Sequence, residues 1–157
     1  MGVVYEVTRV SDGRRLALKV LTTEATGISL ARLAREAEVA GKITHPNLVA
    51  IVDVDVSSAG ELYIVMELVK GQSLSEARKY YGNVQWALGV LGQIASGLAA
   101  LEASGIVHRD LKPANVLLTG NDNTPIAKIC DFGIARVMQA VTRTGSCVPA
   151  DSIDGAS

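Results

Sequence analysis

Hydrophobic residues dominate four stretches in the first part of the chain, and short polar segments separate them. The stretches run over Val3 to Val10 and Arg15 to Leu21, on either side of the turn sequence Ser11-Asp12-Gly13, and over Leu48 to Val56 and Leu62 to Glu67. Short runs of this kind between turn residues predict strands, and an Asp-Gly turn between two of them predicts a hairpin. The first part of the chain is therefore predicted to be rich in strands.

The period changes to that of a helix in three segments. Gly27 to Ile43 places apolar residues on one face and charged residues on the other, and His45-Pro46-Asn47 ends this predicted helix. A short helix is predicted near Leu74 to Tyr80. A long helix is predicted over Val84 to Leu101, with Gly105 as the glycine that ends it.

The long helix carries no charge over its 18 residues, which is close to the length of a short membrane span. It contains glutamine, serine and glycine, however, and its large apolar residues recur mostly at steps of three and four. The members of this apolar stripe are Trp86, Leu91, Ile94, Leu98 and Leu101. Such a stripe is typical of a buried helix in a soluble protein, so we expect a core helix and no membrane span.

Two short strands, Val116 to Thr119 and Ile126 to Cys130, follow the long helix and enclose a polar loop. Beyond Arg136 the periodic pattern fades, and residues 147–157 show none. A strand-rich first half with one helix, followed by a helical second half, predicts an α+β fold.

Composition narrows the class of protein further. The chain has 157 residues, of which 48% are hydrophobic and 20% charged, and 15 Lys and Arg against 16 Asp and Glu give a net charge of -1. This composition excludes a disordered tail, and it gives no indication of nucleic acid or a membrane surface as a partner. The two cysteines, Cys130 and Cys147, lack the spacing of a zinc site, and the N-terminus lacks the features of a signal peptide. We therefore expect a cytoplasmic location.

Residues suited to phosphoryl transfer are concentrated after the long helix. The chain there reads His108-Arg109-Asp110-Leu111-Lys112-Pro113-Ala114-Asn115, and 16 residues later Asp131-Phe132-Gly133. Phosphoryl transfer requires mainly positioning and the neutralisation of charge on the transferred group. Asp110 can orient an incoming hydroxyl, and Lys112 can contact a phosphate. The amide oxygen of Asn115 and the carboxylate of Asp131 are suitable ligands for Mg²⁺.

These two strings match the protein-kinase signature, and the chain resembles the catalytic domain of a eukaryotic-like, bacterial-type Ser/Thr protein kinase. The resemblance implies a two-lobed fold, with an antiparallel sheet and one helix in the N-lobe and an incomplete helical C-lobe. It also implies ATP and Mg²⁺ as cofactors and a protein as substrate. Lys112 stands two residues after Asp110, as in the Ser/Thr class, and the Lys-Pro pair argues against a small-molecule phosphotransferase.

An upstream strand and helix carry the next part of the resemblance. Leu16-Ala17-Leu18-Lys19 resembles the strand whose lysine holds the α- and β-phosphates, and alternation places Ala17 and Lys19 on one face. Glu36 lies at the edge of the apolar face of its helix, where a carboxylate is costly unless it is paired. The resemblance makes Lys19 its partner, so we expect a Lys19–Glu36 ion pair.

The resemblance also implies an apolar slot for the adenine base. Tyr63 to Val69 resembles the strand that leads into the hinge between the lobes, with Met66 beside the back pocket and the backbones of Glu67 and Val69 bonding adenine. The implied nucleotide-binding residues are Gly2, Val4, Ala17, Lys19, Met66, Glu67, Val69, Leu117 and Cys130. Cys130 is either a reactive thiol or, as we expect, a small buried filler.

Other residues at family positions have two interpretations each. His108 and Phe132 are expected to stack in the apolar column that couples the lobes, and His108 is expected to pack in the core rather than bind a metal. Thr142 and Thr144 stand where the family's activation loop is phosphorylated, with Arg109 as the candidate phosphate receiver. The simpler interpretation is that these threonines are solvated loop residues.

The resemblance covers residues 2–146. Residues 1–66 correspond to an N-lobe without its first strand, with Gly2 as the last glycine of the phosphate-covering loop. Residues 67–146 correspond to the hinge and the C-lobe as far as the start of the activation segment, and residues 147–157 form a tail that departs from the family pattern. We therefore expect the long helix to expose an apolar surface through which the chain can associate.

Three functions fit these observations. The first is ATP-dependent phosphoryl transfer to Ser and Thr hydroxyls of proteins, impaired by truncation. The second is a nucleotide-binding, pseudokinase-like module, and the third is a non-functional kinase fragment. The retained Lys19, Asp110 and Asp131 favour the first, whereas the departures at both ends favour the other two.

Overall fold

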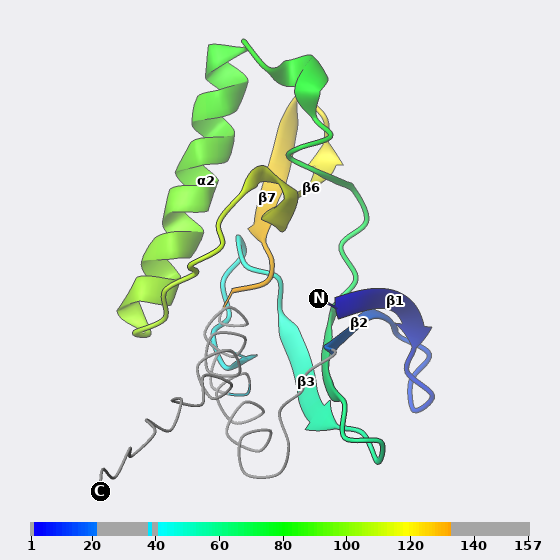
Figure 1. Cartoon of the computed structure of the whole chain (residues 1–157). Coiled ribbons are helices and arrows are strands. Elements are labelled where there is room, and N and C mark those ends of the chain that lie inside the picture. The colour runs from blue at the N-terminus through cyan, green and yellow to red at the C-terminus, as the bar shows by residue number, and fades with distance from the viewer. Residues whose placement is uncertain (1, 22–37, 39–40, 133–157) are drawn as a thin grey trace, which may run out of the picture.

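The computed structural model describes residues 2–21, 38 and 41–132 (Figure 1). Most of the helix expected over Gly27 to Ile43, and every residue after Phe132, lie outside this described part. The described elements form two antiparallel sheets and one long helix, which confirms the α+β class.

The first sheet has four strands in the order β1-β2-β4-β3, and all neighbours are antiparallel. The strands are β1 (Gly2–Thr8), β2 (Arg15–Leu21), β3 (Ile51–Val56) and β4 (Leu62–Glu67). Strand β4 has the predicted bounds, and its positions alternate between buried and half-buried.

Strand β3 forms an edge of this sheet and is irregular. Its register with β4 shifts between Ile51 and Asp53, as at a β-bulge. The carboxylates of Asp53 and Asp55 accept hydrogen bonds from the backbone N–H groups of Val54 and Val56, at 2.9 and 2.7 Å. Acidic side chains therefore bind backbone donors along this edge.

The hairpin between β1 and β2 is fixed by its turn, as predicted. Gly13 has a φ of 70°, in the left-handed region that favours glycine. The Asp12 carboxylate accepts a hydrogen bond from the Arg14 backbone N–H at 3.1 Å and another from Arg9 Nε at 2.9 Å. The bond from Arg9 is the main cause that lowers the pKa of Asp12 to about 2.

The second sheet is smaller and has the order β5-β6-β7. Strands β6 (Val116–Asn121) and β7 (Thr124–Ile129) pair where two strands were predicted, but both extend into the predicted loop, of which only residues 122 and 123 lie between them. Strand β5 (Gln72–Ser73) has two residues and was not predicted. The chain enters β5 through Gly71, where a Cβ atom would overlap the Leu118 carbonyl oxygen. Glycine is therefore needed at position 71 for the close approach of two backbones.

The segment between β5 and the long helix forms a single 3-10 turn, η1 (Arg78–Tyr80), in place of the short helix predicted near Leu74 to Tyr80. Side-chain hydrogen bonds replace those of a longer helix here. The Glu76 carboxylate accepts hydrogen bonds from both the backbone N–H and the hydroxyl of Ser73. Tyr80 stacks on Trp86 with 5.0 Å between ring centroids, which fixes the turn to the helix.

The long helix α2 (Val84–Ala103) is confirmed and is capped at both ends. The Asn83 side chain accepts a hydrogen bond from the Trp86 N–H at 3.1 Å. At the other end Gly105 has a φ of 71°, and the N–H groups of Gly105 and Ile106 donate to carbonyls in the last turn. Gly105 ends the helix as predicted.

The face of α2 that is buried differs in part from the predicted stripe. The buried residues are Trp86, Val90, Ile94, Gly97 and Leu101. The prediction was wrong at Leu91, which is exposed, because the buried face continues through the neighbouring Val90 at steps of three and four. This face packs against β7, and the two elements lie side by side in Figure 1.

Helix α2 comes close to the second sheet and to Asn47 at Gly97. A Cβ atom there would lie 3.0 Å from both the Asn47 carbonyl oxygen and the Cδ1 atom of Ile129. Asn47 Nδ2 donates to the Ala127 carbonyl at 2.9 Å and to Gln93 Oε1 at 3.0 Å, and the Ala127 N–H donates to the same Gln93 oxygen. A polar network therefore joins three segments beneath the apolar contacts.

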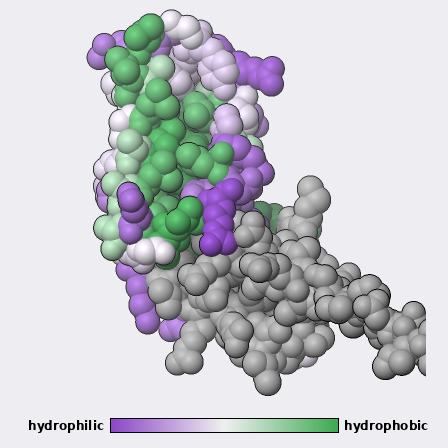
Figure 2. Space-filling view, turned by 60° about the vertical axis from the view of Figure 1, so that its left-hand side comes forward, coloured by the Kyte–Doolittle hydropathy of each residue, from purple (hydrophilic) through white to green (hydrophobic). Residues whose placement is uncertain are grey.

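The opposite side of α2 is apolar and exposed, and Figure 2 shows apolar side chains gathered over this side of the molecule. Val84, Leu88 and Leu91 are 70%, 60% and 58% exposed. By length and composition α2 could cross a membrane, but core helices of soluble proteins pass the same test. One face of α2 packs on β7, and 28% of its apolar window is buried, so the core-helix expectation stays a prediction.

The two sheets meet where the segment before β3 passes β7. Leu48 forms a parallel bridge with Ile129, the Val49 N–H donates to the Ile129 carbonyl at 2.9 Å, and the Ile129 N–H donates to the Asn47 carbonyl at 2.9 Å. Strand β3 consequently begins at Ile51 rather than at Leu48, because the first residues of the predicted strand pair with the other sheet. Each sheet has an apolar cluster of its own on its side of this junction.

Candidate active site

The loop between α2 and β6 contains a strained residue. Arg109 has a φ of 62°, which residues other than glycine rarely adopt. The Asp110 N–H donates to the His108 carbonyl across it at 2.8 Å, and the 3-10 turn η2 (Pro113–Asn115) follows. Such backbone strain costs roughly 1–3 kcal/mol per residue and tends to occur at functional sites, so this loop is a candidate site.

Two side chains of this loop converge on one carboxylate. Lys112 Nζ lies 2.8 Å from Asp110 Oδ2, and Asn115 Nδ2 donates to the Asp110 carbonyl at 2.8 Å and to Oδ2 at 3.2 Å. The hydrogen bond from Lys112 is the main cause that lowers the pKa of Asp110, and the same bond raises the pKa of Lys112. At neutral pH the loop therefore presents a carboxylate and an ammonium side by side.

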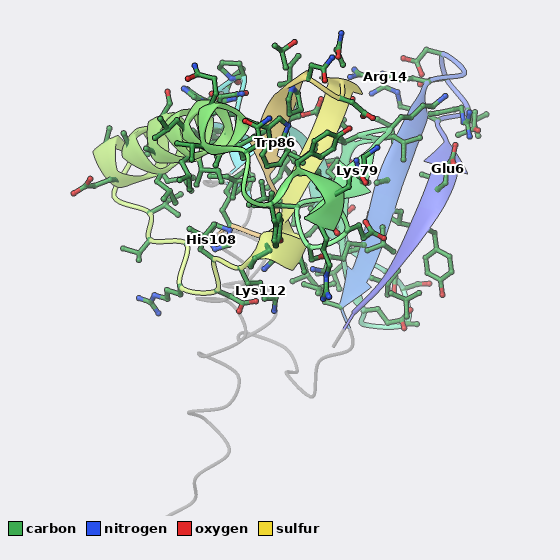
Figure 3. All side chains as sticks on the ribbon, turned by 90° about the horizontal axis from the view of Figure 1, so that it is seen from above. Glu6, Arg14, Lys79, Trp86, His108 and Lys112 are labelled. Carbon is green, nitrogen blue, oxygen red and sulfur yellow. The ribbon has the colours of Figure 1, made fainter. Side chains whose placement is uncertain are left out.

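His108 anchors the loop to the core. The side chain is buried, and Nε2 lies 3.0 Å from the Cys130 carbonyl oxygen, which can only accept, so Nε2 carries the hydrogen. Its Nδ1 atom is buried with no hydrogen-bond partner, unlike the other buried side-chain N and O atoms of the described residues. Figure 3 shows His108 and Lys112 on the segment that follows α2. The ring thus fixes this segment to the residues just before Asp131.

Asp131 also has a positive φ, of 63°. Its Oδ2 lies 2.7 Å from Nζ of Lys19 in β2, and both side chains are mostly buried. The ion pair connects the first sheet to the segment that leaves the second. The expected pairing of Lys19 with Glu36 lies outside the described residues.

Asn115 is connected to Asp131 through Cys130, which directly precedes Asp131 in the chain. The Cys130 N–H donates to the Asn115 carbonyl at 2.9 Å. Since Asn115 Nδ2 is bonded to Asp110, the amide oxygen is the atom that can bind a cation. An amide oxygen and a carboxylate suit Mg²⁺, which keeps several waters and takes further ligands from phosphates. These residues therefore fit the expected Mg²⁺.

The Cys130 thiol is held in its protonated form. Burial, and after it the charge of Asp131, raise the pKa of this thiol to about 12. Its Sγ atom also donates to the Asn115 carbonyl at 3.4 Å. A thiol of this kind is unreactive at neutral pH, which favours the interpretation of the half-buried Cys130 as a small filler rather than a reactive thiol.

Five of the residues expected to bind the nucleotide, namely Ala17, Met66, Val69, Leu117 and Cys130, share one apolar cluster. Ala17 in β2 lies opposite Met66 in β4, and both are buried. Partly buried side chains packed against them include Val69, Leu117 and Cys130. These residues come from both sheets and from the hinge between them, as a slot for a flat base requires.

Met66 lies at a cavity, whereas Val4 and Gly2 lie outside the apolar cluster around Ala17. Met66 lies on the wall of a small cavity, whose lining is Val49, Ile51, Ile64, Met66, Asp131 and Phe132. Val4 pairs with Lys19 in the sheet but is exposed, and Gly2 pairs with Leu21 at the start of β1. Neither Val4 nor Gly2 belongs to the apolar cluster around Ala17.

The structure contains an ion pair that the sequence did not predict. Lys128 Nζ in β7 lies 2.6 Å from Glu67 Oε1 at the end of β4. The same oxygen accepts a hydrogen bond from the Ala50 N–H at 2.9 Å. The available sequence signal was a lysine inside the apolar strand predicted over Ile126 to Cys130, because a charge there requires a partner.

Some expected residues fall outside the described part of the chain. They are Glu36, Gly133, Thr142, Thr144 and Cys147. The expected activation-loop phosphorylation and its receiver therefore stay predictions.

Known proteins are similar to this chain over nearly all of its length. The pattern of the protein kinase domain matches residues 1–151. The chain is 37% identical over 154 residues to serine/threonine-protein kinase PknD of Mycobacterium tuberculosis and 39% identical over 155 residues to PknA of the same species. It is 34% identical over 156 residues to serine/threonine-protein kinase pkn3 of Myxococcus xanthus.

These alignments cover 92 to 94% of this chain but only 23 to 35% of the relatives' own lengths. The chain therefore spans about a quarter to a third of the curated relatives that it matches. Because the family pattern extends over nearly all of its residues, and its catalytic loop and Asp-Phe-Gly segment stand in that pattern's order, the chain belongs to the protein kinase domain family.

Proposed function

We propose that this chain transfers phosphoryl groups from ATP to Ser or Thr hydroxyls of a protein substrate. The observation that carries this proposal is the hydrogen-bonded cluster of Asp110, Lys112 and Asn115, which Cys130 joins to the Lys19–Asp131 pair. The named relatives, which are Ser/Thr-protein kinases, support the same reaction.

Lys19 and Asp131 supply the two charges that a phosphate and its cation require. Mg·ATP, when bound, provides the phosphoryl group and the metal that offsets its charge. The ammonium of Lys19 would hold phosphate oxygens, and the Asp131 carboxylate with the Asn115 amide oxygen would hold Mg²⁺. The direct contact between Lys19 and Asp131 already places these opposite charges next to each other.

Asp110 would orient the hydroxyl that receives the phosphoryl group. Its lowered pKa keeps it ionised at neutral pH, so that it can accept a hydrogen bond from that hydroxyl. Lys112 adds positive charge beside it, where charge develops on the transferred group. Asn115 fixes Asp110 through two hydrogen bonds and thereby links acceptor orientation to cation binding.

The test is transfer of labelled phosphate from Mg·ATP to the chain itself and to casein, compared with Asp110→Asn. We expect this substitution to reduce transfer by about 10³-fold, within the range for loss of a positioned acid or base. The matched control is Asp122→Asn, because Asp122 is an exposed carboxylate that also pairs with a lysine. Equal transfer by the unchanged chain and Asp110→Asn would contradict the proposal. ATP binding without any transfer would instead identify a nucleotide-binding module.

We further propose that residues 1–66 form the N-lobe and residues 67–146 the hinge and first part of the C-lobe of a cytoplasmic protein. The exposed apolar side of α2 is proposed as the surface through which the chain associates. Its exposed Val84, Leu88 and Leu91 support this assignment, since contiguous exposed apolar residues commonly mark contact surfaces.

A further inference from the structure

We infer that the Glu67–Lys128 ion pair positions the hinge carbonyl that contacts adenine, and that it thereby sets a preference for adenine over guanine nucleotides. The inference rests on the proposed function, because it concerns the same nucleotide site. Glu67 and Lys128 are positioning residues here, since neither side chain is assigned a contact with the nucleotide.

The hydrogen bonds of Glu67 differ from those of a regular antiparallel pair. The Glu67 N–H donates to the Ala50 carbonyl at 2.9 Å. In a regular antiparallel pair, the Ala50 N–H would in turn donate to the Glu67 carbonyl. The Ala50 N–H donates instead to the Glu67 side chain, at 2.9 Å to Oε1. The carboxylate of Glu67 thus takes the place of its own carbonyl in the ladder.

Lys128 holds the carboxylate in that place. Its Nζ lies 2.6 Å from the oxygen that accepts from Ala50, and Lys128 belongs to β7 of the other sheet. The two side chains are 19% and 24% exposed, whereas those of the Lys79–Asp122 pair are 62% and 60% exposed. A less exposed pair is screened less by solvent and costs more to disrupt than one at the surface.

This arrangement has a consequence for base recognition. Because the Glu67 N–H is bonded to Ala50, the carbonyl oxygen is the main-chain atom through which Glu67 can bond a base. A carbonyl oxygen accepts from the 6-amino group of adenine, but guanine presents an oxygen at that position and offers no donor. The ion pair fixes this carbonyl relative to β7 and the apolar cluster around Ala17 and Met66. Discrimination between the two purines therefore depends on the ion pair.

The experiment measures the Kd of the full chain for Mg·ATP, Mg·GTP and inorganic tripolyphosphate by calorimetry. We expect Lys128→Met to weaken ATP binding about tenfold, as for one lost hydrogen bond, and to leave GTP and tripolyphosphate binding unchanged. The ATP-to-GTP preference should fall by the same factor. Lys128→Arg should restore most of it, because arginine can also bind the carboxylate. Lys79→Met, which removes an exposed ion pair, should leave all three Kd values unchanged.

A purely structural role for Lys128 would weaken all three ligands alike, or lower the Tm without changing the ATP-to-GTP preference, and either result would overturn the inference. Glu67→Gln provides a second test if Lys128→Met does not fold. It keeps an oxygen for the Ala50 N–H but loses the charge that binds Lys128, and it should also lower the preference. ATP binding with an unchanged preference would overturn this inference alone. Absence of ATP binding by the unchanged chain would overturn the proposed function as well.

Discussion

The two sheets contribute to the site in different ways. In the first sheet, strand register places the functional side chains, with Ala17 and Lys19 on one face of β2 and Met66 opposite Ala17. In the second half, Asp110 and Asp131 lie on loops on either side of a hairpin, at or next to residues with positive φ. Regular backbone suffices to line a slot for a flat base. Clustered charges require irregular backbone, which here is held by hydrogen bonds.

A small number of contacts joins these two regions. Two are ion pairs, Lys19 with Asp131 and Glu67 with Lys128, and one is the backbone pairing around Ile129. The apolar contacts otherwise lie mostly within one cluster for each sheet, although Leu117 of β6 also packs against the cluster of the first sheet. Substitutions at the ion pairs should therefore affect the shared site, whereas substitutions in one cluster should affect the stability of that region.

The largest expected effect comes from the charge that β2 contributes. Saturating Mg·ATP, at about 100 times its Kd, should stabilise the chain by roughly 2.7 kcal/mol and raise its Tm by several degrees. Lys19→Met should abolish this rise, because the triphosphate loses its ammonium partner and Asp131 loses its counter-charge. Thermal unfolding with and without Mg·ATP measures it. Lys42→Met is the control, since Lys42 is exposed; a rise that survives in Lys19→Met would show that the regions bind nucleotide without this contact.

A smaller effect is expected where α2 packs on the second sheet. Gly97→Ala should lower the free energy of unfolding by about 1–3 kcal/mol, because the new methyl group meets the Asn47 carbonyl oxygen and Ile129. Gly92→Ala on the same helix has open space and should be neutral or stabilise by up to about 1 kcal/mol. Urea unfolding compares the two variants. Equal stabilities would mean that the close contact at Gly97 does not determine packing in this region.

The smallest effect is expected at Cys130, whose thiol should not be alkylated in the native chain. With its pKa raised to about 12 from an ordinary 9.0, the Cys130 thiol is almost entirely protonated at pH 8, and iodoacetamide should leave it unmodified in the native chain. Alkylation should accelerate as the pH rises toward 12. The stability that the protonated thiol contributes is present below pH 9 and is lost as the pH rises through 12. Peptide mapping at Cys130, with the urea-unfolded chain as control, measures this; rapid native alkylation at pH 8 would contradict the raised pKa of the thiol.

The parts of the fold with a strong apolar pattern could be predicted from the sequence. Strand β4 was predicted from a short continuous apolar run, and helix α2 from apolar residues that recur at steps of three and four. The two-residue strand β5 carries no period, and the pairing of Leu48 with Ile129 joins residues far apart in the chain. Leu91 was assigned to the buried face because it is large, although the helical step selects Val90.

The residues of the candidate site could be predicted from the sequence, but the contacts among them could not. The loop residues Asp110, Lys112 and Asn115 came from a string whose resemblance to a known family is specific. The hydrogen bonds among them were not available from the sequence, because they depend on the φ of Arg109. The Glu67–Lys128 pair was missed because a lysine within an apolar strand indicates a partner but does not identify it.

The edge strand β3 has a consequence for self-association of the folded chain. An open sheet edge ordinarily offers free N–H donors on which a further strand can add, which is a common start of aggregation. Here Asp53 and Asp55 bind the N–H groups of Val54 and Val56 and place two negative charges beside them. A second chain approaching this edge would meet repulsion and donors that are already bonded. Sheet growth is therefore disfavoured at the side of the molecule that β3 forms.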